Sequence, residues 1–225
     1  MFQSKDIFIG TPTHFCKRYC ADRFMSGIIS VPKGISKYIV SNSLADASDY
    51  YKPTQDYTGH NIYFRQLSLD RDFYGHKDSI HRRIVYTMNF LRSMFLDTTC
   101  GLYISLESDV IISYQIVDEI LFTLGNNPEI DILHTNCYKG FNAEQRLSKT
   151  NRITLGCTAI KRRVLDSIKF RYDENLLAAF HDAFFIMDAI ASGFNAYYHP
   201  HIKVNHLRNV NKSQGWDELP REETR

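Results

Sequence analysis

Residues 102–112 read LYISLESDVII, an apolar run that is interrupted by Glu107, Ser108 and Asp109 and then becomes apolar again. The run predicts a buried strand, and two acids at its carboxyl end are costly to bury unless a cation lies between them. In an open α/β sheet, ligands bind outside the carboxyl ends of the strands. Oxygen ligands suit magnesium or manganese, which share their coordination with phosphates. The stretch therefore suggests a metal and a phosphate-bearing substrate, whereas the plain alternative is a polar turn with two solvated acids.

Length and composition place the chain among folded globular proteins. Its 225 residues are 44% hydrophobic and 23% charged, which allows one large domain or two small ones. The net charge of +2 does not indicate a nucleic-acid partner, and the basic run at 161–163 is typical of a solvated helix face. No window is apolar for long enough to span a membrane, and Lys5 and Asp6 interrupt a potential signal peptide. We expect a soluble, cytoplasmic protein, with peripheral contact to a membrane surface as the alternative.

The five cysteines support the same expectation. They lie at positions 16, 20, 100, 137 and 157, and an odd, scattered set favours a reducing compartment over a disulfide framework. His14 lies close to two of them, but the paired Cys-x-x-Cys spacing of a structural zinc site is absent. Ordinary thiols are the preferred interpretation.

Strand and helix patterns alternate along the chain, which favours a mostly parallel α/β sheet. The turn Gly10-Thr11-Pro12-Thr13 is expected to end the first strand, and Gly193 is expected to end the last helix. Strands are predicted at 6–10, 36–40, 61–66, 102–106 (followed by the acids and a second apolar stretch to 112), 131–134, 153–160 and 196–204, and helices at 17–29, 79–96, 114–124, 162–168 and 175–192. We find no internal repeat.

The order of these motifs resembles the family 2 glycosyltransferases with the GT-A fold. The resemblance runs through IFIGTPTHF, YIVSNS, LYISLESDV, LGCTAIKRRVLDSIKF and FHDAFFIMDAIASGFNAYYHPHIKVNHL, and so covers most of residues 6–207. It implies a Rossmann-like, three-layer αβα sandwich with a mostly parallel central sheet. It also divides the chain into a catalytic domain at 1–208 and a polar C-terminal tail at 209–225.

The resemblance assigns a donor and metal site to the acid-bearing stretch. In the family an Asp-x-Asp triplet holds a divalent metal against the diphosphate of a nucleotide sugar, and Glu107 and Asp109 stand at the matching positions. His206, just after the last strand, matches a histidine that completes the metal site in many relatives, and this mixed ligand set is compatible with manganese. The resemblance thus implies manganese or magnesium as cofactor, with Glu107, Asp109 and His206 as metal ligands.

Further residues match positions that contact the nucleotide sugar. The expected donor is a UDP-sugar, although Ser41 and Asn42 stand where the family often has an acid for the base, which leaves the base open. Arg82 or Arg83 is a candidate for the diphosphate because a guanidinium forks onto phosphate oxygens. The full set of expected donor-binding residues is Thr11, Pro12, Thr13, Ser41, Asn42, Arg83, Glu107, Ser108, Asp109 and Gly156.

Asp182 matches the general base of the family, which takes the proton of the acceptor hydroxyl from the start of a late helix. His181 precedes it where an acid is usual. The resemblance thus implies an inverting, hexosyltransferase-like enzyme whose acceptor is a glycan, a lipid-linked sugar or a protein; the oligomeric state is open. Two alternatives remain: a sugar-phosphate nucleotidyltransferase, although its glycine-rich loop is lacking, and an inactive module that binds a glycan or nucleotide. No Gly-x-Gly-x-x-Gly follows a strand, which disfavours a dehydrogenase.

Overall fold

The computed structural model describes residues 3–43, 57–67, 69, 79–137, 146–173 and 181–207. Its strands are β1 (Ile7–Thr13), β2 (Ser36–Ser41), β3 (Ile62–Gln66), β4 (Leu102–Leu106), β5 (Val110–Ile111), β6 (Ile132–Asn136), β7 (Ser148–Lys149), β8 (Cys157–Lys161), β9 (Ala196–Lys203) and β10 (Asn205–His206). Its helices are α1 (Ala21–Ser30), α2 (Ser79–Leu96), α3 (Tyr114–Asn126), α4 (Arg162–Ser167) and α5 (His181–Ala191). Three short 3-10 helices are η1 (Ser4–Asp6), η2 (Phe15–Cys20) and η4 (Thr58–His60). The predicted tail at 209–225 lies outside the described residues.

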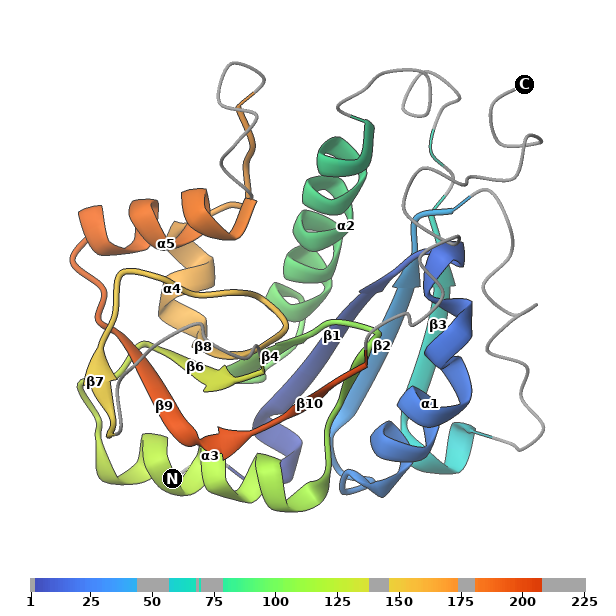
Figure 1. The fold of residues 1–225 in the computed structure, drawn as a ribbon, viewed down its shortest axis with the longest axis horizontal. Coiled ribbons are helices and arrows are strands. Elements are labelled where there is room, and N and C mark those ends of the chain that lie inside the picture. Colours follow the sequence, from blue (N-terminus) through green and yellow to red (C-terminus); the bar gives the residue numbers. More distant parts are fainter. Residues whose placement is uncertain are drawn as a thin grey trace.

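An eight-stranded sheet in the order β3-β2-β1-β4-β8-β6-β9-β7 forms the centre of the molecule (Figure 1). Strands β3, β2, β1 and β4 pair in parallel, as do β6 and β9. Strand β8 is antiparallel to both β4 and β6, so these two strands run in the same direction. The prediction of a mostly parallel sheet is confirmed, with β8 and the short edge strand β7 as the antiparallel members.

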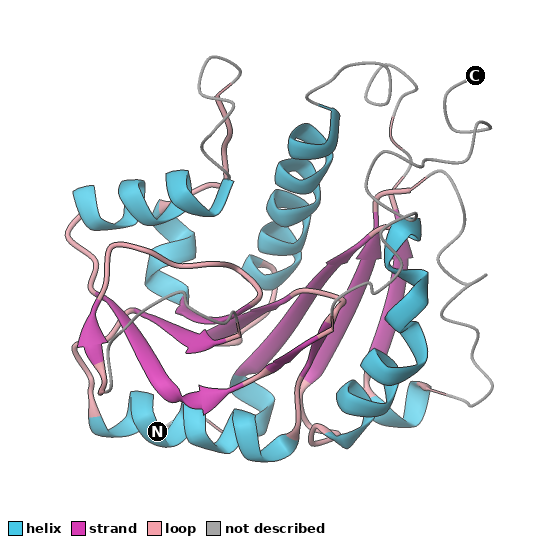
Figure 2. Cartoon of the chain, in the orientation of Figure 1, coloured by secondary structure: helices cyan, strands magenta, loops and turns pink. Residues whose placement is uncertain are grey.

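Helices cover both faces of this sheet (Figure 2). Because successive strand residues point to opposite faces, Ile7 and Ile9 of β1 join one core cluster and Phe8 joins the other. The first cluster contains the apolar faces of α1 and α3, and the second contains those of α2, α4 and α5. The molecule is therefore the three-layer αβα sandwich that the sequence resemblance implies.

Most predicted strand boundaries lie within about two residues of the observed ones, but those of β1 and β8 are further off. Strand β1 does not end at Gly10 but continues to Thr13, because Pro12 and Thr13 still pair with β2. Strand β4 pairs only with the part of β1 up to Gly10, so Pro12 has a strand on one side alone, where its missing N–H is tolerated. Strand β8 begins at Cys157 rather than Ile153.

Two positions in this fold require glycine, one for a close approach between strands and one for a positive φ at a helix end. A Cβ on Gly10 would overlap the ring of Tyr103, which is fully buried on the neighbouring strand β4. Gly193 has φ = +85° and follows the end of α5 at Ala191 by two residues, and the amide of Phe194 donates to Ala189 O. The predicted helix end at Gly193 is therefore confirmed, while the predicted start at 175 lies outside the described residues.

Within the described part of the chain, no helix combines the length and the apolar character needed to cross a membrane.

Candidate active site

The acids Glu107 and Asp109 lie in a tight turn between β4 and β5, at the carboxyl edge of the sheet. The amide of Val110 donates to Glu107 O at 3.0 Å and closes the turn. The amide of Glu107 in turn donates to Gly156 O at 2.9 Å, so the segment before β8 supports the turn from the neighbouring strand. We call residues 107–110 the acid turn.

A two-stranded ladder brings His206 to the acid turn. In the antiparallel pair of β10 and β5, His206 lies opposite Val110, and the amide of Leu207 donates to Asp109 O at 2.7 Å. As a result, His206 Nε2 lies 3.3 Å from Asp109 Oδ2. One ligand atom each from Glu107, Asp109 and His206 all lie within 4.8 Å of one another. Residues separated by almost half of the chain thus form one cluster.

Asp109 is the most constrained member of this cluster because it is only 2% exposed. Its Oδ2 receives the ammonium of Lys17 and the hydroxyl of Tyr19, the latter at 3.3 Å. Burial by itself would raise the pKa of Asp109, but the hydrogen bond from His206 and the charge of Lys17 outweigh it and leave the pKa below its usual value. The second oxygen, Oδ1, is buried and accepts no hydrogen bond from the described residues.

This arrangement fits a divalent cation. A buried carboxylate oxygen that lacks a donor is expensive unless a cation or water reaches it. Glu107 and His206 are half-buried, so both can turn toward an ion that enters from solvent. Two carboxylates and an imidazole form a ligand set that suits manganese and magnesium.

The predicted donor-binding residues at the ends of β1 and β2 lie at the same edge. Thr13 donates from Oγ1 to Ser108 Oγ at 3.0 Å, which ties the end of β1 to the acid turn. The amide of Asn42 donates to Thr13 O at 3.1 Å, and its side chain donates to Thr87 of α2 at the same distance. The buried members of this group are Thr11, Thr13, Ser41, Asn42 and Ser108, whereas Pro12 is half-buried.

Arg83 is also buried, at 2% exposure, in the first part of α2. Its Nη1 lies 3.1 Å from Nε2 of His14, the residue that follows β1. Burial, the charge of Arg83 and the charge of Lys17 lower the pKa of His14 to about 3. His14 is therefore neutral at physiological pH and accepts a hydrogen bond from the guanidinium, which holds Arg83 at the end of β1.

Sequence reasoning missed the contribution of the segment that follows β1. His14, Lys17 and Tyr19 all contact groups at the site, and Tyr19 also donates to Leu207 O at 3.2 Å. The only sequence signal was their position directly after a strand that ends at the ligand-binding edge. A lone lysine or tyrosine in such a loop is otherwise typical of ordinary surface.

Asp182 lies in the first turn of α5, where its Oδ1 accepts the amide of Ala183 at 3.0 Å. Burial raises its pKa, against opposing effects of two backbone hydrogen bonds and of the charge of His81 in α2. Burial and the same His81 charge lower the pKa of the neighbouring His181 to about 4. The start of α5 thus lies beside the start of α2. Asp182 makes no hydrogen bond or ion pair with the acid turn among the described residues.

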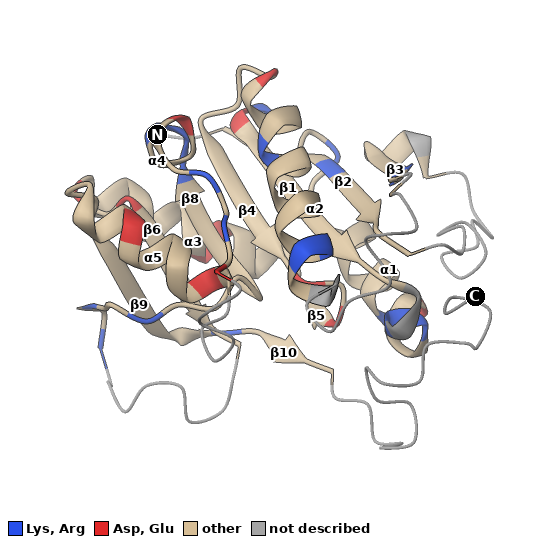
Figure 3. Ribbon diagram, turned by 90° about the horizontal axis from the view of Figure 1, so that it is seen from above, with Lys and Arg blue, Asp and Glu red and all other residues tan. Residues whose placement is uncertain are grey.

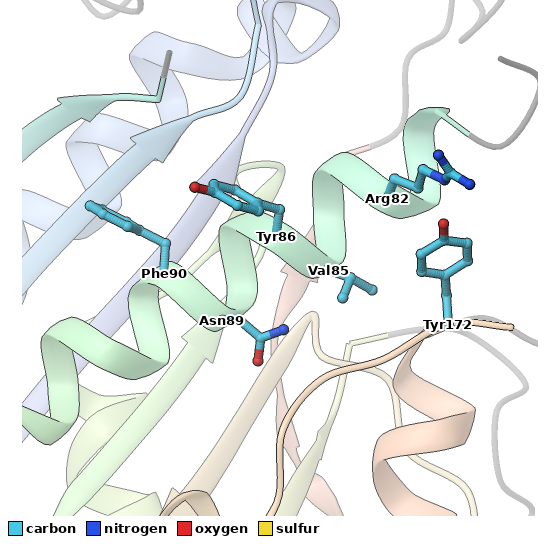
Figure 4. A pocket seen from close by; sticks show the side chains of 6 residues that line it. All are labelled: Arg82, Val85, Tyr86, Asn89, Phe90 and Tyr172. Atoms are coloured by element: carbon cyan, nitrogen blue, oxygen red, sulfur yellow. The ribbon is translucent and has the colours of Figure 1, made fainter. Parts of the chain in front are cut away.

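A groove runs along the outer side of α2, next to this meeting point (Figure 4). It has a volume of about 540 Å³ and is lined by Arg82, Val85, Tyr86, Asn89, Phe90 and Tyr172. The guanidinium of Arg82 lies 5.8 Å from the ring centre of Tyr172. Asn89 both donates to Phe170 O at 2.8 Å and accepts from Phe170 N at 3.1 Å, which fixes the segment that carries Tyr172. We call this feature the α2 groove; no residue of the acid turn lines it.

Charge is evenly distributed over the described part of the chain. In the view from above, Lys and Arg (blue) and Asp and Glu (red) are interspersed along the elements, and neither sign forms a continuous stripe (Figure 3). This distribution agrees with the small net charge of +2. It lacks the basic stripe that is typical of proteins that bind nucleic acids.

Comparisons by sequence find no relative, because no family model matches the chain and no curated protein is significantly similar to it. Comparison by structure finds many similar folds. The mannosyltransferase PcManGT from Pyrobaculum calidifontis, in complex with GDP-Man and Mn²⁺, superposes with a TM-score of 0.68 over 92% of this chain and 58% of its own, at 11% identity. TarS 1-349 from S. aureus, in complex with UDP-GlcNAc, gives 0.64 over 97% of this chain and 63% of its own, at 12% identity.

These structures determine the fold class. The chain spans less than two thirds of the length of each of them. At 11% and 12% identity the likeness concerns the fold, and it agrees with the strand order and the three layers described above. The fold of this chain is that of the GT-A glycosyltransferases, as the resemblance in the sequence predicts.

Proposed function

We propose that this chain is a metal-dependent, inverting glycosyltransferase that moves a hexose from a nucleoside diphosphate sugar to an acceptor hydroxyl. The observation that carries the proposal is the cluster of Glu107, Asp109 and His206 at the carboxyl end of β4. In an α/β sheet of this kind, that edge is where ligands bind. The likeness to structures that were solved with GDP-Man and UDP-GlcNAc supports a nucleotide sugar as donor.

In the proposed reaction, Glu107, Asp109 and His206 would hold a manganese or magnesium ion. When bound there, the ion supplies charge neutralisation for the departing nucleoside diphosphate. The burial of Asp109 and its low pKa support this role, because the carboxylate stays ionised at physiological pH and keeps one oxygen without a donor. Thr13 and Asn42 are proposed to contact the donor from the ends of β1 and β2, and Arg83 from α2.

Asp182 is proposed as the general base. It takes the proton of the acceptor hydroxyl while that oxygen attacks the anomeric carbon from the face opposite the leaving group. Its raised pKa supports this role, since a base is more effective when its pKa approaches the working pH. Its position in the first turn of α5 also agrees with the place of the general base that the resemblance implies.

The α2 groove is our candidate for the acceptor site. One end of the groove is lined by Arg82, the neighbour in sequence of His81, whose charge acts on Asp182. Aromatic walls with few polar groups are typical of sites for organic ligands, and Tyr86, Phe90 and Tyr172 supply such walls. We assign the catalytic domain to residues 1–208 and expect it to act in the cytoplasm.

A test starts with a panel of UDP- and GDP-sugars, each with and without Mn²⁺. We expect one donor to raise the melting temperature in the presence of Mn²⁺ and to release a nucleoside diphosphate rather than pyrophosphate. The variant Asp109→Asn should lose the metal-dependent part of both signals, whereas Asp22→Asn, which removes an exposed acid from α1, should retain them. Release of pyrophosphate would indicate a nucleotidyltransferase instead. Equal stabilisation of Asp109→Asn would remove this residue from the site.

A further inference from the structure

Lys17 is fixed against the acid turn by the short helix η2. Its amide donates to His14 O at 2.8 Å, and its own carbonyl accepts the thiol of Cys20 at 2.9 Å. The same thiol lies 3.3 Å from Ser108 O, in the middle of the acid turn. The backbone that carries Lys17 is therefore held directly beside Glu107 and Asp109.

The ammonium of Lys17 contacts the same oxygen of Asp109 that faces His206. Lys17 Nζ forms an ion pair with Asp109 Oδ2, and His206 Nε2 lies 3.3 Å from that oxygen. The Lys17 side chain is 19% exposed while the Asp109 side chain is 3% exposed, so the lysine reaches in from the solvent side. A protein cation thus lies among the atoms that would coordinate a metal.

A lysine ammonium and a divalent ion cannot share this position. At separations of a few Å, in a partly buried site, like charges repel strongly because little water screens them. An ion that coordinates Asp109 through Oδ2, or through Oδ1 of the same carboxylate, therefore meets the charge of the ammonium, and its binding favours departure of the ammonium. A lysine has a flexible four-carbon stem, so its ammonium can turn toward another anion within reach while η2 stays in place.

On the basis of the proposed function, we propose that Lys17 is a built-in competitor of the metal. In the absence of donor, its ammonium neutralises Asp109 and keeps the affinity for the divalent ion low. When a nucleoside diphosphate binds at the same edge, its phosphates give the displaced ammonium a new anion to contact. Metal and donor therefore bind cooperatively, and by linkage each strengthens the other to the same extent.

The test measures Mn²⁺ binding by titration calorimetry, first without nucleotide and then with UDP or GDP. We expect Lys17→Met to bind Mn²⁺ alone about tenfold more tightly than the unmodified chain, the scale of one partly buried ion pair. The gain in Mn²⁺ affinity on adding nucleotide should shrink in this variant. Lys17→Arg, which keeps the competing charge, should behave like the unmodified chain.

Two controls make the result specific. Lys33→Met removes the same charge from an exposed turn before β2 and should leave the Mn²⁺ affinity unchanged. Asp109→Asn should abolish the measured binding in every background. If Lys17→Met does not fold, Lys17→Gln removes the same charge while keeping a hydrogen-bonding side chain.

An unchanged or weaker Mn²⁺ affinity in Lys17→Met or Lys17→Gln would overturn the competitor role, even if nucleotide sugars still bound with Mn²⁺. Conversely, tighter Mn²⁺ binding in the variant, together with no binding of any nucleotide sugar, would support competition and contradict the proposed transferase function. Failure of Mn²⁺ to bind any of the proteins, with or without nucleotide, would overturn both proposals.

Discussion

The acid turn and the α2 groove differ in what builds them. The acid turn is one short segment that meets charged groups from distant parts of the chain, Lys17 and His206, and it is held by hydrogen bonds to β1, β10 and the segment before β8. The α2 groove is made mainly of rings and apolar side chains from one helix and the segment that Asn89 fixes. The first region is suited to a charged, specific ligand such as a metal and diphosphate. The α2 groove offers mainly apolar and aromatic contact area, which suits an organic ligand such as the proposed acceptor.

The largest effect is expected at the acid turn. Asp109→Asn should lower metal-dependent transfer about 1000-fold, because it removes the most buried anionic ligand and thereby several kcal/mol of charge stabilisation. Rate measurements at saturating Mn²⁺, with circular dichroism to verify folding, would check this. Asp22→Asn is the matched control. If Asp109→Asn kept the rate of the unmodified chain, the acid turn would not be the site of the metal and diphosphate.

The next effect tests the proposed general base at the start of α5. Asp182→Asn should lower transfer about 100-fold through loss of the general base, while Mn²⁺ and nucleotide still bind. In the unmodified chain, kcat/KM should fall as the pH drops through the raised pKa of Asp182, since the base must be ionised. This acid limb should therefore lie above the ordinary Asp value of about 3.9, and it should vanish in the variant.

Asp188→Asn is the control for this helix. Asp188 lies in α5 as well, but it forms an exposed ion pair with Arg171 at 2.7 Å, an interaction of small energetic consequence. Its replacement should leave the pH profile unchanged. If Asp188→Asn lost as much activity as Asp182→Asn, the loss would reflect the helix rather than the base.

A smaller effect is expected in the α2 groove. Tyr86→Ala should raise the KM for the acceptor about fivefold to tenfold, the scale of one lost aromatic contact, without changing donor binding. Tyr114→Ala is a matched control because the two tyrosines are 47% and 48% exposed, and Tyr114 lies on α3, on the opposite side of the sheet. Equal KM values in the two variants would mean that the acceptor binds elsewhere.

The two regions also differ in how far the sequence predicts them. Met88, Leu91 and Phe95 recur at helical spacing, so α2 and its buried face could be predicted, and all three lie in the core. The acid turn could be predicted because acids interrupt an apolar strand, but its pairing with His206 came from motif order alone. The ladder of β5 and β10 has two residues in each strand, which is too short for any periodic pattern.

Contacts that depend on tertiary packing could not be predicted. Whether Lys17 reaches Asp109 depends on the path of η2, and nothing in the residue types near position 17 determines that path. The continuation of β1 through Pro12 was missed for a similar reason, because proline is tolerated there only where β4 no longer pairs with β1. Local pattern therefore predicts the elements, and long-range pairing determines which polar groups meet.

The last prediction concerns His14, near the acid turn, and the dependence of the free energy of unfolding on pH. With a pKa of about 3 in the fold and 6.5 otherwise, His14 stays neutral in the folded chain while the unfolded chain takes up a proton below pH 6.5. The contribution of neutral His14 to the free energy of unfolding is therefore complete above pH 6.5 and is lost progressively as the pH falls toward 3. His14→Gln removes this difference and still offers Arg83 an acceptor. Urea unfolding measures the free energy of unfolding at each pH between 7 and 4.5. In His14→Gln, this free energy should fall less steeply with decreasing pH than in the unmodified chain, by at most about 1.4 kcal/mol per pH unit. An unchanged slope would mean that His14 is charged in the fold and does not accept from Arg83.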